Sequence, residues 1–431
     1  MRTRTRNWTI FWVVLVVLAA GAFVVLSGLL DPEYETSSVD TATGVSDEQV
    51  IARGKYLAKA GDCTACHTTK EGAPFAGGVP LDTPFGTIYG TNITPDKEHG
   101  IGSWTSADFY SVMHDGIAPN HPLYPAMPYT SFRAMTREDS DALYAYLQSV
   151  RPVAVANVES DIPFPFNMRF LMRGWNLLFL RSPLPDASEG DSDAWVRGRY
   201  LANPLGHCTE CHTPRGALGQ LVLDETLEGG ALGSINAPDI TPEGLAARGW
   251  TEPALRQFLA LGISPHSTAY GEMFEAFHNS TQYLKKEDNK ALVVYLSGDK
   301  PLAPAPLPEV RDDASGASMT TGSGRSLYVA MCAGCHGVQG QGKPNVVVAL
   351  HGNSTVRNAD PHNLLHVILA GIQAKSFPDN QGRQEMPGFA DVLSDQQVAD
   401  LANYLRSAWG GQKADVQPAA VAASRGEAAP G

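Results

Sequence analysis

The sequence has few cysteines and few charged side chains. Six of its 431 residues are cysteine, and charged residues make up 18% of the chain against 43% for hydrophobic residues. Acidic residues outnumber basic ones, which gives a net charge of -13 at pH 7. Because proteins that bind nucleic acids carry basic surface, this balance argues against a nucleic-acid partner. The acidic excess fits a face that steers toward a basic partner.

Several catalytic signatures are also missing. No Ser-His-Asp arrangement, phosphate-binding loop or dinucleotide-binding fingerprint occurs in a suitable context. The sequence therefore indicates no catalytic site of these classes in this chain, and its chemistry must lie in other residues.

All of the cysteines fall in three copies of one pentad, Cys-x-x-Cys-His, at residues 63–67, 208–212 and 332–336. Two thiols at this spacing can form thioether bonds to the two vinyl groups of one porphyrin, and the adjacent imidazole then faces the iron. Zinc binding and thiol redox chemistry are the alternatives, but a zinc site would need further ligands at regular spacing. We therefore predict three covalently bound haem c groups. The predicted attachment residues are Cys63, Cys66, Cys208, Cys211, Cys332 and Cys335, and the predicted histidine ligands are His67, His212 and His336.

A second axial ligand is predicted for each iron. Met127, Met273 and Met386 each lie shortly before the last predicted helix of their unit, and Pro follows Met127 and Met386. A lone methionine more often fills a core, but these three share one position. Methionine raises the reduction potential and suits electron transfer, whereas an open position suits substrate chemistry. The alternative ligands, none of which recurs at one offset in all three units, are His114, His121, His266, His278, His351, His362, His366, Met113, Met135 and Met331. Pro80 and Pro344 are candidates for the backbone carbonyls that orient the haem imidazoles.

The pentads belong to three similar units. A helix is predicted before each pentad (residues 47–57, 195–201 and 323–328), and a last helix that ends in Tyr-Leu is predicted after it (residues 136–147, 286–296 and 394–405). Each first helix contains one glycine, which costs roughly 1 kcal/mol against alanine. The recurrence of this glycine predicts close packing against another helix. The predicted fold is mainly α, with three tandem class I-type cytochrome c domains after an N-terminal transmembrane helix.

The N-terminus carries a basic flank followed by the apolar residues 8–30. This stretch is long enough to span a bilayer, and the basic flank predicts an N-terminus in the cytoplasm. A cleaved signal peptide is the alternative, because residues 20–22 resemble a cleavage site. Covalent haem attachment takes place on the export side. We therefore expect a single anchor in the inner membrane and haem domains on the periplasmic side.

The predicted order of segments follows from these features. It is 8–30 transmembrane anchor or signal peptide, 46–150 cytochrome c domain 1, 151–190 linker with an apolar helix, 191–298 domain 2, 299–322 flexible linker, 323–410 domain 3 and 411–431 disordered tail. The helix inside the first linker either packs between domains or is an interfacial or partner-docking helix, with Arg169 and Arg173 near lipid phosphates or an acidic partner.

Together these features resemble those of a known family, the membrane-bound triheme cytochrome c subunit of bacterial alcohol, gluconate and aldehyde dehydrogenase complexes. The resemblance covers residues 46–410, and beside the pentads it rests on residues 84–89, 92–95, 127–129 and 386–389. It implies a catalytic partner subunit (a quinoprotein, flavoprotein or molybdoprotein) and transfer of the electrons to ubiquinone in the membrane. A stand-alone membrane-tethered carrier to a terminal oxidase or reductase is one alternative. A haem enzyme such as a peroxidase is another.

Overall fold

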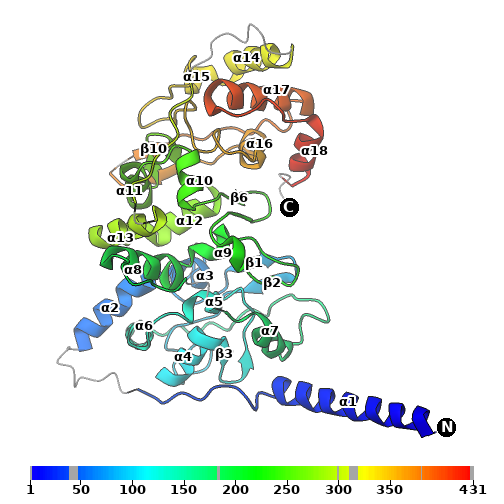
Figure 1. Cartoon of the computed structure of the whole chain (residues 1–431). Helices are drawn as coiled ribbons and strands as arrows, with labels where there is room; N and C mark the ends of the chain where they lie inside the picture. The colour runs from blue at the N-terminus through cyan, green and yellow to red at the C-terminus, as the bar shows by residue number, and fades with distance from the viewer. Residues whose placement is uncertain are drawn as a thin grey trace. The chain divides into compact units, whose positions relative to one another are not determined.

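The computed structural model describes residues 2–37, 47–181, 185–298, 300–309, 319–379 and 381–427. The chain is mainly helical, and the strands of its described part form two-stranded antiparallel sheets (Figure 1). It divides into two compact units, one of Met1–Pro185 with Asn203–His207 and one of Asp186–Ala202 with Cys208–Gly431. The second and third pentads lie in the second unit. The division of this unit into two domains stays a prediction.

The elements of the first unit begin with a long helix and end with a short one. In chain order they are α1 (Arg2–Leu26), α2 (Asp47–Ala60), α3 (Cys63–His67), β1 (Pro80–Thr83), β2 (Gly86–Tyr89), α4 (Ser106–Asp115), β3 (Ile117–Ala118), β4 (His121–Pro122), α5 (Tyr129–Phe132), α6 (Arg137–Ser149) and α7 (Leu171–Phe179). The sheets pair β1 with β2 and β3 with β4.

The rest of the chain begins with a helix that leads to the second pentad. Its elements are α8 (Asp193–Tyr200), η2 (Leu201–Leu205), α9 (Cys208–His212), η3 (Leu223–Glu225), β5 (Gly230–Ala231), β6 (Asn236–Ala237), α10 (Pro242–Ala247), α11 (Glu252–Leu261), β7 (Ile263–Ser264), β8 (Ser267–Thr268), α12 (Gly271–Asn279), η4 (Thr281–Tyr283), α13 (Lys286–Leu296), α14 (Met319–Met331), α15 (Ala333–His336), α16 (His362–Ala370), β9 (Lys375–Phe377), β10 (Gln381–Arg383), α17 (Asp395–Leu405), η5 (Arg406–Gly410) and α18 (Pro418–Glu427). The sheets pair β5 with β6, β7 with β8, and β9 with β10.

The helix before each pentad packs against the last helix of its unit, as the recurring glycine predicts. The pairs are α2 with α6, α8 with α13, and α14 with α17. A Cβ atom on Gly54 would lie 1.9 Å from the carbonyl oxygen of Ala142, and one on Gly198 would lie 1.9 Å from that of Ala291. Gly324 meets α17 in the same way. In all three pairs the glycine also faces the Cβ of the tyrosine in the Tyr-Leu ending, so the two sequence features form one contact.

Substitution of Gly198 with alanine is expected to lower the free energy of unfolding by about 2 kcal/mol, because α8 and α13 must separate to admit the methyl group. Gly426→Ala is the matched control. Gly426 also lies in a helix, but a Cβ there has no neighbour within 4 Å, and alanine favours the helix. Chemical denaturation of both variants measures the difference. Equal stability of the two variants would contradict the packing account.

The chain end and the second linker are more ordered than their composition predicts. Residues 418–427 form α18, and Val421, which is 0% exposed, packs in the core with α17. The prediction of a disordered tail is therefore wrong for residues 411–427, because an alanine-rich segment forms a helix readily once a few side chains are buried. Ala305, inside the predicted flexible linker, donates to Ala246 and accepts from Arg357. Residues 310–318 of that linker lie outside the described residues.

The helix in the first linker, α7, has one packed face and one exposed apolar face. Trp175 is buried, and Asn176 accepts a hydrogen bond from Tyr129 and donates one to the carbonyl of Asp115. Leu177, in contrast, is 69% exposed. The helix therefore packs onto the first unit and leaves apolar surface free on its other side.

The N-terminal helix α1 covers most of the predicted anchor. Its large apolar side chains, such as Trp12 and Phe23, are exposed along its length. No helix among the described residues is both long enough and apolar enough to cross a membrane. The anchor of residues 8–30 stays a prediction.

Candidate haem sites

Each pentad forms a short helical turn, which brings its two cysteines to the same side of the backbone. Burial raises the pKa of Cys63 and Cys208 to about 12 and that of Cys332 to about 11. These three thiols are therefore neutral at pH 7. No group of three or more His, Cys, Asp or Glu side chains that could hold a metal ion occurs among the described residues, so the pentads fit haem c better than zinc.

The histidine of each pentad is held by a backbone carbonyl. The three pairs are His67 Nδ1 with Thr91 O at 2.6 Å, His212 Nδ1 with Pro238 O at 2.6 Å, and His336 Nδ1 with Val348 O at 3.1 Å. Because a carbonyl only accepts hydrogen bonds, Nδ1 carries the proton and Nε2 is left free for iron. Burial lowers the pKa of all three imidazoles, that of His212 to about 4. All three are neutral at pH 7, the form that a metal requires.

The carbonyls that accept hydrogen bonds from these imidazoles are not those of Pro80 and Pro344, which the sequence suggested. Pro80 lies in β1 opposite Tyr89 of the hairpin, and the carbonyl that orients His336 belongs to Val348 rather than Pro344. The prediction for both prolines is therefore wrong.

A repeated motif marks the true positions in the first two sites. Thr91 and Pro238 directly precede residues 92–95 and 239–242, which share the sequence Asn/Asp-Ile-Thr-Pro. In each motif the first side chain accepts hydrogen bonds from the backbone and hydroxyl groups of the threonine two residues later. This turn fixes the carbonyl just before it. The motif was visible in the sequence, but the sequence did not show that it positions the carbonyl bound by the haem histidine.

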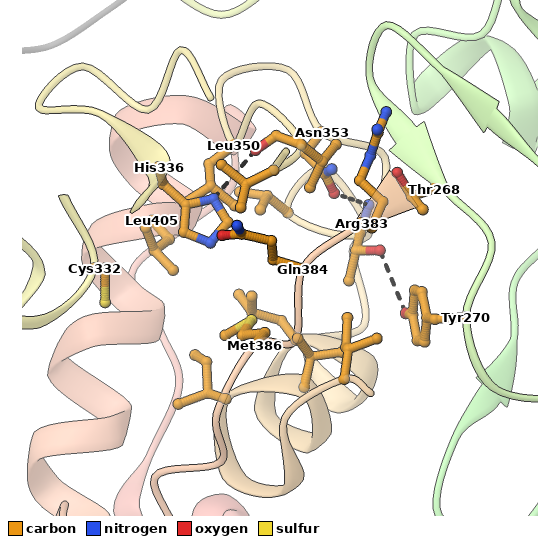
Figure 2. A pocket seen from close by; sticks show the side chains of 18 of the residues that line it. Thr268, Tyr270, Cys332, His336, Leu350, Asn353, Arg383, Gln384, Met386 and Leu405 are labelled. Carbon is orange, nitrogen blue, oxygen red and sulfur yellow. Dashed lines mark hydrogen bonds between the residues drawn. The ribbon is translucent and has the colours of Figure 1, made fainter. Parts of the chain in front are cut away.

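The third pentad opens onto a cavity of about 1070 Å³, including its mouth. Its wall is mostly apolar and contains Cys332, His336 and Met386 (Figure 2). Three of the predicted site residues are thus brought together. A neutral Cys332 thiol, a neutral imidazole and an apolar wall suit a porphyrin, and Met386 lies on the wall of the same cavity. Ligation by Met386 stays a prediction.

The backbone around Met386 is closely fixed. Met386 and Ile372 exchange two backbone hydrogen bonds of 2.8 and 2.9 Å. Gly371 has φ +77°, and a Cβ there would lie 2.3 Å from the Met386 carbonyl oxygen. The backbone of Met386 is therefore held by an antiparallel β-bridge, as a ligand with a defined geometry requires.

Met127 and Met273 occupy corresponding places in one local structure. Each follows a helix, a left-handed glycine and a two-residue hairpin, α4–β3–β4 before Met127 and α11–β7–β8 before Met273. The glycines, Gly116 and Gly262, have φ +66° and +71°. Both accept a hydrogen bond of 2.7 Å from the residue after the hairpin. Met273 lies inside α12 whereas Met127 precedes α5, so the two sites differ in detail. Ligation by either methionine stays a prediction.

Several of the rival ligands have other contacts. The ring nitrogens of three histidines lie in hydrogen bonds within the protein, His114 with Asp115 and Tyr34, His351 with Pro308 O, and His362 with Ser234 O. Met113 and Met135 are buried in the core. These contacts favour structural roles for all five.

The cavity at the third pentad also receives residues from the segment that leads to Met273. Thr268, Ala269 and Tyr270 line it, and the hydroxyl of Tyr270 lies 3.4 Å from Thr355 Oγ1. Figure 2 shows Tyr270 at the edge of the cavity that is remote from His336. A segment next to Met273, a predicted ligand of the second haem, therefore forms part of the wall of the cavity at the third pentad.

Comparison with known proteins identifies cytochromes c as relatives of this chain. A cytochrome c family model matches residues 51–151 and 322–409. The cytochrome c subunit of gluconate 2-dehydrogenase from Pantoea cypripedii is 39% identical over 403 residues, which cover 88% of this chain and 90% of the relative. The cytochrome c subunit of alcohol dehydrogenase (quinone) from Gluconacetobacter polyoxogenes is 36% identical over 411 residues, or 92% and 86% of the two chains. A diheme c-type cytochrome from Cereibacter sphaeroides is 36% identical over 294 residues, or 66% and 94%.

Proposed function

Since the chain belongs to the family of cytochrome c subunits of bacterial gluconate, alcohol and fructose dehydrogenases, we propose that it is the triheme electron-transfer subunit of a membrane-bound periplasmic dehydrogenase. It takes electrons from a catalytic subunit and delivers them to ubiquinone. The observation that carries this proposal is the third site, where Cys332, His336 and Met386 line one apolar cavity.

The residues of the chain provide the environment for electron transfer. Haem c, when bound, supplies the one-electron redox chemistry. The backbone carbonyls of Thr91, Pro238 and Val348 hold the three imidazoles in the tautomer that leaves Nε2 free. The apolar wall of the third cavity would keep water away from the haem, and a methionine ligand would raise its reduction potential. With the histidine and the methionine both bound, the iron would have no position open to a substrate.

The second unit supports electron exchange between its two sites. The segment of residues 268–270 lines the third cavity, and Met273 follows it within one turn of helix. A short stretch of protein thus belongs to both sites. This supports a relay through the chain in place of independent carriers.

Two helices support attachment to the membrane. The exposed apolar side chains of α1 are typical of a helix covered by lipid or by another chain. Asp31, at the end of the predicted anchor, forms an ion pair of 2.7 Å with Arg173 of α7. This pair ties the exposed apolar face of α7 to the anchor. We place the anchor in the inner membrane and the haem-binding units in the periplasm.

The partner that we propose is a catalytic subunit that oxidises an alcohol, a sugar acid or an aldehyde. It would carry a quinone, a flavin or a molybdenum cofactor, and the relatives are named as subunits of dehydrogenases for alcohol, gluconate and fructose. Because no catalytic site is proposed for this chain, the substrate is selected in the partner.

Purification of the chain from its native membranes tests the proposal. We expect a dehydrogenase subunit to co-purify with it, substrate to reduce the haem absorbance, and a soluble ubiquinone analogue to reoxidise it. A matched chain in which a cleavable export leader replaces residues 1–30 should carry the same haem content and bind the membrane fraction more weakly. A chain that is always isolated alone, with no dehydrogenase activity, would favour a stand-alone carrier and contradict the proposal.

A further inference from the structure

The predicted ligand Met273 differs from the other two methionines in the residue that follows it. Proline follows Met127 and Met386, whereas Phe274 follows Met273. A proline restricts the backbone of the residue before it. Met273 lacks this restriction and lies in the first turn of α12, so the contacts of this helix determine where its side chain lies.

The ring of Phe274 is buried against the strand β9. Its centroid lies 5.4 Å from that of Phe377, in an edge-to-face arrangement, and both rings are only 6% exposed. Phe277, three residues later on α12, packs against the ring of Phe377 at 5.9 Å. Aromatic pairs of this kind stabilise a contact by more than the area they bury. Two aromatic contacts therefore fix α12 to β9.

A lysine strengthens the same junction. The Nζ atom of Lys375, at the start of β9, lies 4.3 Å from the centroid of the Phe274 ring and 3.6 Å from Glu275 Oε1. A cation over an aromatic ring is attracted to the negative face of the ring. Phe274 and Glu275 are the two residues directly after Met273, so one strand holds both of them.

The strand that holds α12 belongs to the third site. Lys375 and Phe377 both line the cavity that contains His336 and Met386. The strand β10, which pairs with β9, leads along the chain to Met386. A group bound in the third cavity would therefore contact the strand that anchors the helix of Met273.

We propose that Phe377 and Lys375, which line the third cavity, are positioning residues for Met273, the predicted ligand of the second haem. This inference rests on the proposed haems at the second and third pentads. A methionine ligand raises the reduction potential of a haem, so a less firmly held Met273 lowers the potential of the second haem. The wall of the third site thus sets the potential of the second.

A double-mutant cycle on the reduction potential tests the proposal in the full-length, haem-loaded chain. Phe274→Leu and Phe377→Leu are made singly and together, and Met273→His identifies the midpoint of the second haem, since only the haem that it ligates should respond. We expect each single variant to lower this midpoint by about 59 mV, a tenfold loss in preference for the electron. The double variant should lower it no further, because the two rings act as a pair.

Two further variants complete the design. Lys375→Gln removes the cation and keeps both rings, so it should give a smaller fall in the same midpoint. Tyr283→Leu, which removes an exposed ring from η4 after α12, is the control and should shift no midpoint. If Phe377→Leu does not fold, a cycle of Lys375→Gln with Phe274→Leu tests the same junction.

The outcomes separate this inference from the proposed function. Lower thermal stability of Phe274→Leu and Phe377→Leu with an unchanged second midpoint would assign the two rings a purely structural role and overturn the inference. Additive shifts in the double variant would also overturn it, because they would show that the rings act independently. If Met273→His shifts no midpoint, or if mass spectrometry finds no haem on Cys208 and Cys211, the failure lies in the proposed function.

Discussion

Chains in which Cys332 and Cys335 are both replaced by alanine will carry one haem fewer than the native chain and will no longer pass electrons from substrate to quinone. The two thiols are the predicted covalent attachment of the haem at this site, so a chain without them should leave the cavity empty. Stability should fall by on the order of 5 kcal/mol, because the wall includes core residues such as Tyr328 and Leu364 that would face an empty space.

Haem content, substrate-driven reduction and denaturation measure the three parts of this effect. Val338→Ala, an exposed change close to the same pentad, is the control and should alter none of them. Quinone reduction at the native rate in the double variant would show that the third site is not part of the relay. Native haem content in that variant would show that Cys332 and Cys335 do not attach haem.

Replacement of Met386 with histidine will lower the midpoint potential of one haem by a few tenths of a volt, within the range of about 0.8 V that axial ligands span. Histidine is a stronger donor to ferric iron than methionine, so the oxidised form gains stability. The centre should stay low-spin. Met386→Ala should instead open the position, so that the same haem becomes high-spin and binds cyanide.

Met331 offers a matched control for this prediction. It is a rival candidate close to the same pentad, and its side chain is partly exposed on α14. Met331→His should leave every midpoint unchanged. If Met386→His leaves all potentials unaltered while Met331→His shifts one, the ligand assignment at the third site is wrong.

The helical framework was predictable from the sequence because its signals are local. Ser394 and Thr136 cap α17 and α6 at the positions that helix-start chemistry predicts. The glycine of each first helix predicted a close contact with another helix, and the structure confirms this contact. Such features depend on a few neighbouring residues and on one partner helix, so a repeated pattern is enough to find them.

The surroundings of the iron sites were less predictable because they depend on contacts between distant segments. Val348 and Tyr270 reach the third site through loops that carry no haem motif.

The prediction of a disordered chain end was wrong for a different reason. Composition alone treats residues 411–431 as too poor in large apolar side chains to fold. A few buried side chains, Val416 and Val421 among them, and an ion pair between Arg425 and Asp395 hold α18 in place. The stabilisation comes from contact with α16 and α17, and a composition average does not contain that contact.

Haem content and spin state of the intact chain give the most direct measurement of electron relay by three histidine–methionine centres. A pyridine haemochrome assay against protein concentration counts the haems, the mass of the intact chain checks the count, and the ferric spectrum with and without cyanide reports the ligands. We predict three haems per chain, all low-spin and all unresponsive to cyanide. Two haems per chain, or one high-spin centre that binds cyanide, would contradict this account.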